Sequence, residues 1–128
     1  MKLQPDRSEG VNLVSACAPG MLRINAQTYT TSLLLPWHGD ALAWPCSDFA
    51  QLRSEHFELL LPLAPELVIF GSGHRLRFVA PALLSSLIER RIGIETMDTA
   101  AACRTYNVLA GEGRAVVAAL LLEPPGAA

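Results

Sequence analysis

The stretch MDTAAACRTYN, residues 97–107, carries the densest group of side chains that could act on a ligand or a substrate. Carboxylate, hydroxyl, thiol, guanidinium, phenol and amide groups follow one another in it, from Asp98, Thr99, Cys103, Arg104, Tyr106 and Asn107. Asp98 or Thr99 is placed to cap a following helix, because its side chain can accept a hydrogen bond from an exposed backbone N–H. Capping alone accounts for these two residues.

Cys103 is the candidate nucleophile of this stretch. It lies in the first turns of a predicted helix, where the helix dipole and neighbouring Arg104 would lower the pKa of its thiol. His74 is the histidine placed to act as its base, and no third group orients that base. The small residues before Cys103 equally suit close packing of a helix on a sheet, in which a free cysteine behaves as a small hydrophobic residue. We expect the packed role and keep the reactive thiol as the alternative.

Asn107 lies one helical turn after Cys103 on the same stripe of the predicted helix, and Tyr106 shares a face with Ala102 and Ala110. An amide on the buried stripe of a helix must be hydrogen-bonded, either within the protein or to a ligand. We predict that Asn107 braces the loops that follow residues 71 and 97. Contact with a ligand in an open rim is the alternative.

A second polar cluster, Gly71, Ser72, Gly73 and His74, follows the apolar segment ELVIF. Backbone N–H groups in such a glycine loop can cradle an anion. The loop is not a dinucleotide-binding fingerprint, because Leu76 stands where GxGxxG requires its third glycine and no helix begins directly after it. Two glycines that serve only a tight turn are the alternative.

The elements that position these clusters follow from hydrophobic spacing and turn residues. Residues 11–45 contain short apolar segments separated by turn sequences, which predicts an antiparallel β-meander. Residues 47–61 have helical spacing, with Ser47 or Asp48 as the N-cap.

From residue 66 strands alternate with helices. The pattern predicts strands at 66–70, 92–97 and 114–122 and helices at 81–91 and 99–110. The helix at 81–91 should begin with Pro81, end at Gly93 and bury its apolar face, formed by Leu84, Leu87 and Ile88.

Strand, helix, strand, helix, strand is the order in which right-handed crossovers build a parallel sheet. The expected fold is therefore α/β with three layers, in which the N-terminal meander is followed by a βαβαβ unit that forms a mixed, largely parallel central sheet. Ligands bind outside the carboxyl ends of the strands in such sheets. The two polar clusters follow two of those ends, so a binding site is predicted where they meet. Its candidate residues are Gly71, Ser72, Gly73, His74, Asp98, Thr99, Cys103, Arg104, Tyr106 and Asn107.

Length and composition limit the classes of function. A chain of 128 residues suits a single domain, expected over residues 1–128 with flexible ends at 1–10 and 123–128. Ten basic and twelve acidic residues without a Lys/Arg run argue against nucleic acid as a partner, because phosphate neutralisation needs a basic stripe. The apolar runs are too short, or too interrupted by charge and proline, to span a bilayer.

Cysteine usage and the first residues indicate the compartment. The chain begins without the apolar segment of a secretory signal, and its three separated cysteines offer neither a disulfide framework nor a CxxC pair. Both features fit a reducing cytoplasm. No catalytic or metal-binding motif is complete, so neither a cofactor nor a metal is expected.

The stretch MDTAAACRTYNVLAGEGR, the upstream ELVIFGSG and the N-terminal GMLRINAQTY together resemble the family called domain of unknown function 498/598, whose relatives include a mitochondrial respiratory complex I assembly factor. The resemblance covers residues 11–122 and implies a three-layer fold with a mixed central sheet. The loop reads GSG where the family often has GTG, a change that keeps a hydroxyl. The family pattern falls on Gly71, Gly73, Met97, Asp98, Thr99, Ala101, Thr105, Tyr106, Asn107, Leu109, Glu112 and Arg114.

The resemblance favours a non-enzymatic interaction or assembly module that acts on a protein partner. A binder of a small anion or metabolite at the rim of the GSGH and MDT loops is the alternative. A thiol enzyme centred on Cys103 is the least favoured hypothesis, because the chain shows no base, nucleophile and oxyanion donor in register.

Overall fold

The N-terminal part of the chain forms a small antiparallel sheet, as the alternating pattern predicts. In the computed structural model, which describes residues 10–124, the strands β1 (Val14–Ala18), β2 (Met21–Ile24) and β3 (Gln27–Tyr29) pair in the order β1-β2-β3. The ends of the single domain expected over 1–128, residues 1–9 and 125–128, lie outside the described residues.

The central sheet has five strands in the order β5-β4-β8-β6-β7. Strand β6 (Leu67–Gly71) lies between β7 (Gly93–Met97) and β8 (Val116–Leu120) and is parallel to both. On the other side of β8, β4 (Leu33–Pro36) pairs antiparallel with β8, and β5 (Leu42–Ala43) pairs antiparallel with β4. The predicted mixed sheet with a parallel βαβαβ unit is therefore confirmed.

The meander expected over residues 11–45 is wrong beyond β3, because β4 leaves the hairpins and pairs with β8. All of the residues of β4 are buried, in the sequence Leu-Leu-Leu-Pro. A strand that is apolar on both faces needs cover on both faces, which the interior of a layered sheet supplies and an exposed hairpin does not.

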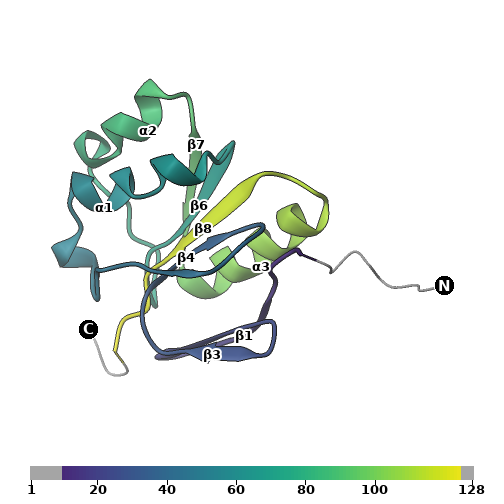
Figure 1. Cartoon of the computed structure of the whole chain (residues 1–128). Helices are drawn as coiled ribbons and strands as arrows, with labels where there is room; N and C mark the ends of the chain where they lie inside the picture. The colour runs from purple at the N-terminus through teal and green to yellow at the C-terminus, as the bar shows by residue number, and fades with distance from the viewer. Residues whose placement is uncertain (1–9, 125–128) are drawn as a thin grey trace.

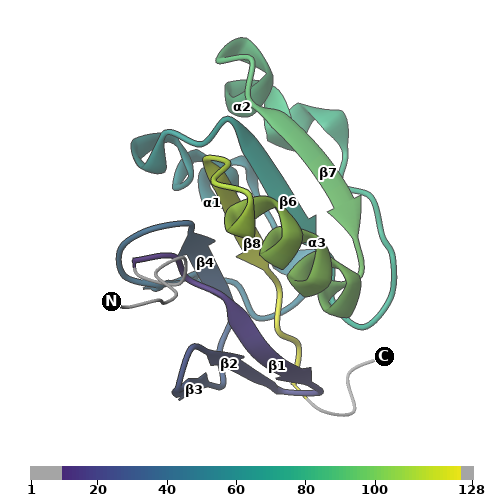
Figure 2. The same cartoon turned by 90° about the vertical axis from the view of Figure 1, so that its right-hand side faces the viewer.

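The two faces of the central sheet are covered by different segments (Figures 1 and 2). On one face lie α3 (Thr99–Gly111) and the three-stranded sheet, and on the other lie α1 (Ser54–Glu58) and α2 (Ser85–Glu89). The alternating side chains of β8 enter both cores, with Ala118 under α3 and Val117 on the opposite side. The expected three layers are present.

The long helix predicted at 47–61 is wrong. The chain forms a 3₁₀ turn at Phe49–Gln51, the short α1, and a second 3₁₀ turn at Leu61–Leu63. Asp48 caps only the first turn, by accepting from the Gln51 N–H at 3.1 Å. Extended backbone at Leu52 interrupts the helix.

The helix predicted at 81–91 begins at Pro81 as expected, but its first part, Pro81–Leu84, is a 3₁₀ turn. This tighter turn changes which side chains share a face. Leu87 is fully buried, whereas the expected burial of Ile88 is wrong, since 57% of its surface is exposed. Gly93 begins β7 and does not end the helix.

Candidate functional site

The two polar loops predicted to meet do lie side by side. β6 and β7 are parallel and in register, with Gly71 opposite Met97, so both loops leave the same edge of the sheet. The Ser72 N–H donates to the Met97 carbonyl at 2.8 Å, and the Thr99 N–H donates to the Gly73 carbonyl at 2.8 Å. The Gly73 N–H donates to Thr99 Oγ1 at 2.9 Å. The predicted meeting of the GSGH and MDT clusters is confirmed.

These same hydrogen bonds remove the basis for an anion cradle at Ser72 and Gly73, because both N–H groups already donate to protein oxygens. Gly71 serves close packing: a Cβ there would lie 2.9 Å from the Thr99 Cα and 3.2 Å from the Ala102 Cβ. The buried Ser72 hydroxyl donates to the Arg75 carbonyl at 2.7 Å. The GSGH loop is thus built for tight contact with the start of α3.

A buried carboxylate, Glu123, organises the other side of the site. Glu123 Oε1 accepts from His74 Nδ1 at 2.8 Å and from Arg77 Nη2 at 2.7 Å, and Oε2 accepts from the Phe49 N–H at 3.4 Å. Burial by itself would raise the pKa of Glu123, but the hydrogen bonds from Arg77, His74 and the Phe49 N–H hold that pKa below its usual value. Glu123 itself, at the start of the end expected to be flexible, is only 8% exposed.

Arg77 holds the GSGH loop in place through the carbonyl of Ser72. Its Nη2 and Nε donate to the Ser72 carbonyl at 2.7 and 3.2 Å, and its guanidinium lies 4.8 Å from the centre of the Phe49 ring. One cation therefore links the loop, the first 3₁₀ turn and Glu123. Sequence reasoning missed this network, because its members lie far apart in the chain and carry no motif.

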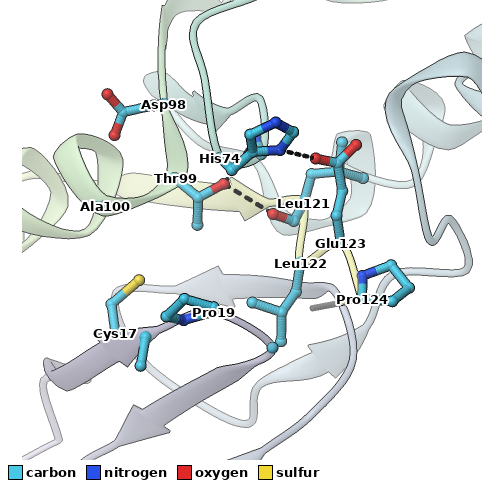
Figure 3. Close-up of a pocket in the computed structure, with 13 residues that line it drawn as sticks. Cys17, Pro19, His74, Asp98, Thr99, Ala100, Leu121, Leu122, Glu123 and Pro124 are labelled. Atoms are coloured by element: carbon cyan, nitrogen blue, oxygen red, sulfur yellow. Dashed lines mark hydrogen bonds and ion pairs between the residues drawn. The ribbon is translucent and has the colours of Figure 1, made fainter. Parts of the chain in front are cut away.

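A pocket of about 420 Å³ opens in front of this network (Figure 3). Its walls come from the β1–β2 turn, the GSGH loop, the start of α3 and the segment after β8. Small and apolar side chains dominate them, with His74, Asp98 and Glu123 as the ionisable groups besides a thiol. The lining residues are Cys17, Ala18, Pro19, Gly20, Gly73, His74, Asp98, Thr99, Ala100, Leu121, Leu122, Glu123 and Pro124.

The structure divides the predicted site residues among three places. Those that line the pocket are Gly73, His74, Asp98 and Thr99. The pocket's Asp98 caps α3 as predicted, with Oδ1 accepting from the Ala101 N–H at 2.9 Å. Buried elsewhere or turned toward the three-stranded sheet are Gly71, Ser72, Cys103, Tyr106 and Asn107, while Arg104 is exposed on the surface of the helix.

Asn107 braces the protein, but with a different partner from the one expected. Its Oδ1 accepts from the Val14 N–H at 2.8 Å, and its Nδ2 donates to the Val14 carbonyl at 2.8 Å. The Tyr106 hydroxyl shares its proton between the carbonyls of Asn12, at 2.9 Å, and Pro36, at 3.1 Å. The bracing role is confirmed, and the prediction that the loops after 71 and 97 supply the partners is wrong.

Comparison with known proteins decides the family. The family model described as protein of unknown function (DUF498/DUF598) matches residues 14–121. This chain belongs to that family.

Relatives of this DUF498/DUF598 protein include the mouse NADH dehydrogenase [ubiquinone] 1 alpha subcomplex assembly factor 3, which is 31% identical over 126 residues. The match covers 97% of this chain and 66% of the mouse protein, so the chain spans just under two thirds of that relative. An uncharacterized protein of Rhodobacter capsulatus is 32% identical over 117 residues, with 87% and 85% of the two chains covered. A crystal structure from Bordetella parapertussis superposes with a TM-score of 0.85 at 32% identity and covers 91% of this chain and 99% of that one.

In this DUF498/DUF598 protein the thiol of Cys17 is exposed, whereas that of Cys103 is buried. Cys103 is 4% exposed, and its hydrogen bond to Cys17 together with burial raises its pKa, so it keeps its proton. The hydrogen bond from Cys103 lowers the pKa of Cys17 to about 7, against the opposing effect of burial. The expected lowering of the pKa of Cys103 by Arg104 is wrong in its net direction, since that charge is outweighed.

Neither a metal centre nor a membrane-spanning helix is found in residues 10–124. No group of three or more His, Cys, Asp or Glu side chains in this range could hold a metal ion. None of its helices has the length and apolar character needed to cross a bilayer.

Proposed function

We propose that this protein is a non-enzymatic interaction module that assists the assembly of a protein complex, and that its pocket holds an apolar segment of a protein partner. The observation that carries the proposal is that the Thr99 hydroxyl and the Glu123 carboxylate of the pocket wall are bonded within the protein. The proposed role in assembly is suggested by the mouse relative, which is named for the assembly of NADH dehydrogenase. The whole mouse protein is longer, so its partners are part of the proposal and not a property carried over.

The pocket wall offers mainly apolar surface to an incoming group. The Thr99 hydroxyl accepts from the Gly73 N–H and donates to the Leu121 carbonyl at 2.8 Å, which leaves it no free proton. Glu123 is bonded to His74 and Arg77. Because these two groups are satisfied, the wall gains most when an apolar side chain displaces water from Pro19, Leu122 and their neighbours.

A small metabolite is the second candidate occupant, since a cavity of about 420 Å³ lies within the range of small-molecule sites. An anion fits this pocket poorly, because the carboxylates of Asp98 and Glu123 stand in its wall. The thiol enzyme centred on Cys103 is not supported, because that thiol is buried and keeps its proton. The proposed place of action is the cytoplasm, in keeping with free thiols at Cys17, Cys46 and Cys103.

The test fills the pocket without touching the network behind it. Ala100 is exposed at its mouth, in the first turn of α3, so Ala100→Trp should block entry at a helix-propensity cost of at most about 0.7 kcal/mol. Val108→Trp is the matched control, because Val108 is 59% exposed on the same helix and does not line the pocket. In the native host, Ala100→Trp should abolish capture of the partner and reduce the amount of assembled NADH dehydrogenase, and Val108→Trp should do neither.

Equal capture by the wild-type protein and Ala100→Trp would refute the pocket as the partner site. A thermal-shift screen of metabolites separates the second candidate, because a ligand at about 100 times its dissociation constant stabilises the fold by roughly 2.7 kcal/mol. A shift that is lost in Ala100→Trp, together with unchanged partner capture, would favour the metabolite over the protein segment.

A further inference from the structure

A bulge in β1 turns Cys17 toward the long helix α3. The register of β1 against β2 shifts between Val14 and Ala16, so that Val14 lies opposite Ile24 and Cys17 lies opposite Leu22. Residues directly opposite each other in an antiparallel pair share a face of the sheet. Ile24 and Leu22 are both buried in the core under α3. The bulge therefore places Cys17 on the helix-facing side, which strict alternation from Val14 would have given to Ala16.

Helix α3 carries a second thiol, that of Cys103, on the side of the helix that faces β1. The Asn107 amide holds Val14 by two hydrogen bonds, which fixes β1 alongside α3. Cys103 lies one helical turn before Asn107 and is part of the same core cluster as Val14 and Leu22. Figure 3 shows the Cys17 sulfur pointing from β1 toward the helix that carries Ala100. One thiol is thus reachable from the pocket, and the other lies buried beside it.

We propose that Cys17 and Cys103 are a hydroperoxide-responsive pair, in which Cys17 is oxidised first and Cys103 resolves it into an intramolecular disulfide between β1 and α3. The exposed position of Cys17 gives an oxidant access, and the buried neighbour supplies the second sulfur without a partner chain. The pair modifies the wall of the pocket itself, because Cys17 lines it. The proposal does not depend on what the pocket binds.

The chemistry balances with a hydroperoxide as the only oxidant. The Cys17 thiolate attacks the distal peroxide oxygen, the O–O bond breaks, and sulfenic acid and an alcohol or water form after one proton is taken up. The Cys103 sulfur then attacks the Cys17 sulfur, its thiol proton leaves, and the sulfenic oxygen departs as water. Two electrons pass from the two thiols to the peroxide. A dithiol reductant reverses the bond by thiol–disulfide exchange.

Cys46 is an internal control for this reaction. It is 5% exposed, its Sγ–H donates to the Asp48 carbonyl at 3.1 Å, and burial raises the pKa of its thiol. It should therefore react slowly in the folded protein. Cys17, with a pKa of about 7, is about half thiolate at neutral pH, whereas an ordinary thiol with a pKa near 9 is about one hundredth thiolate.

The first experiment treats the reduced, folded protein with an equimolar alkyl hydroperoxide and maps its thiols by mass spectrometry after unfolding. The wild-type protein and Cys46→Ala should lose two hydrogen atoms from the intact mass and yield one peptide pair joined through Cys17 and Cys103. Cys103→Ser should stop at a sulfenic acid on Cys17 that dimedone traps, and Cys17→Ser should stay reduced. Consumption of Cys46 as fast as Cys17, or a disulfide only between separate chains, would overturn the proposal.

A second measurement keeps the proposal testable if a variant folds poorly. The rate at which iodoacetamide labels Cys17 in the folded protein should exceed that of Cys46 by at least about 50-fold at neutral pH, because Cys46 has a smaller thiolate fraction than an ordinary thiol. Its pH midpoint should lie near the pKa of about 7 and move upward in Cys103→Ala, which removes the donated hydrogen bond. Equal labelling of Cys17 and Cys46, or a midpoint that Cys103→Ala leaves unchanged, would contradict the pairing of the two thiols.

Discussion

Replacing Asn107 by Leu tests the contact that joins the two halves of the fold. The Asn107 amide binds both the N–H and the carbonyl of Val14, each at 2.8 Å, on the side of β1 that has no neighbouring strand. The side-chain amide therefore satisfies backbone groups that, in the interior of a sheet, a neighbouring strand would pair with. Leu has a similar volume but no hydrogen-bonding group, so Asn107→Leu leaves both backbone groups of Val14 without a partner.

The size of the effect follows from the exposure of the contact. An unsatisfied buried backbone group costs about 1 to 3 kcal/mol, and Val14 is 8% exposed. Because Asn107 is only half-buried, water can reach part of the contact, so we expect a loss near the lower end, about 2 kcal/mol for the two groups together. For a domain of this size that loss lowers the Tm by roughly 6 to 8 °C.

Urea unfolding followed by circular dichroism measures this loss directly. Val108→Leu on the exposed side of α3 is the matched control and should change the free energy of unfolding by less than about 0.5 kcal/mol. Asn107→Asp adds a signature in pH: a carboxylate faces the Val14 carbonyl and repels it, whereas a protonated carboxyl can donate to it. The deficit of Asn107→Asp should therefore shrink below about pH 4. If Asn107→Leu unfolds at the same urea concentration as the wild-type protein, the bracing role is refuted.

Two further predictions concern the walls of the site. The pKa of Glu123 is lowered in the folded protein, so its contribution to stability is present above the ordinary carboxyl value of 4.5 and is lost as the pH falls through the lowered pKa. Urea midpoints between about pH 6 and about pH 3 should fall more steeply for the wild-type protein than for Glu123→Gln, and parallel curves would contradict the pairing. Gly71→Ala forces a Cβ to within 2.9 Å of the Thr99 Cα and should cost about 1 to 3 kcal/mol, which calorimetry can measure, while a neutral effect would mean that β6 and α3 separate easily.

The sequence by itself determined the elements of the second half of the chain. Short apolar segments bounded by glycine predict β6, β7 and β8, and the capped helical pattern predicts α3, because strand and helix periods are local properties. Right-handed crossovers then require the loops after Gly71 and Met97 to share an edge. The register of Gly71 against Met97 bears this out.

Local patterns failed where tertiary packing decides. The helix predicted at 47–61 is divided, and Ile88 faces outward, because helical spacing alone does not reveal where a 3₁₀ turn or an extended residue shifts the helical phase. The sequence of β4 is equally compatible with a strand of the N-terminal meander. Only its burial on both faces, which requires β8 beside it, assigns it to the central sheet.

Among the candidate site residues, only the tertiary structure decided which face the pocket. Glu123 lies in a tail that composition marks as frayed, yet its carboxylate meets His74, 49 positions earlier in the chain. Cys17 reaches Cys103 because one bulge rotates the rest of β1, and a bulge leaves no periodic trace in so short a strand. The sequence determines which chemical groups a chain carries and the helical or strand periodicity of the segment in which each group lies. Charge pairs and thiol contacts between distant segments depend on how the layers dock, and docking is set by the summed burial of many side chains, not by any motif.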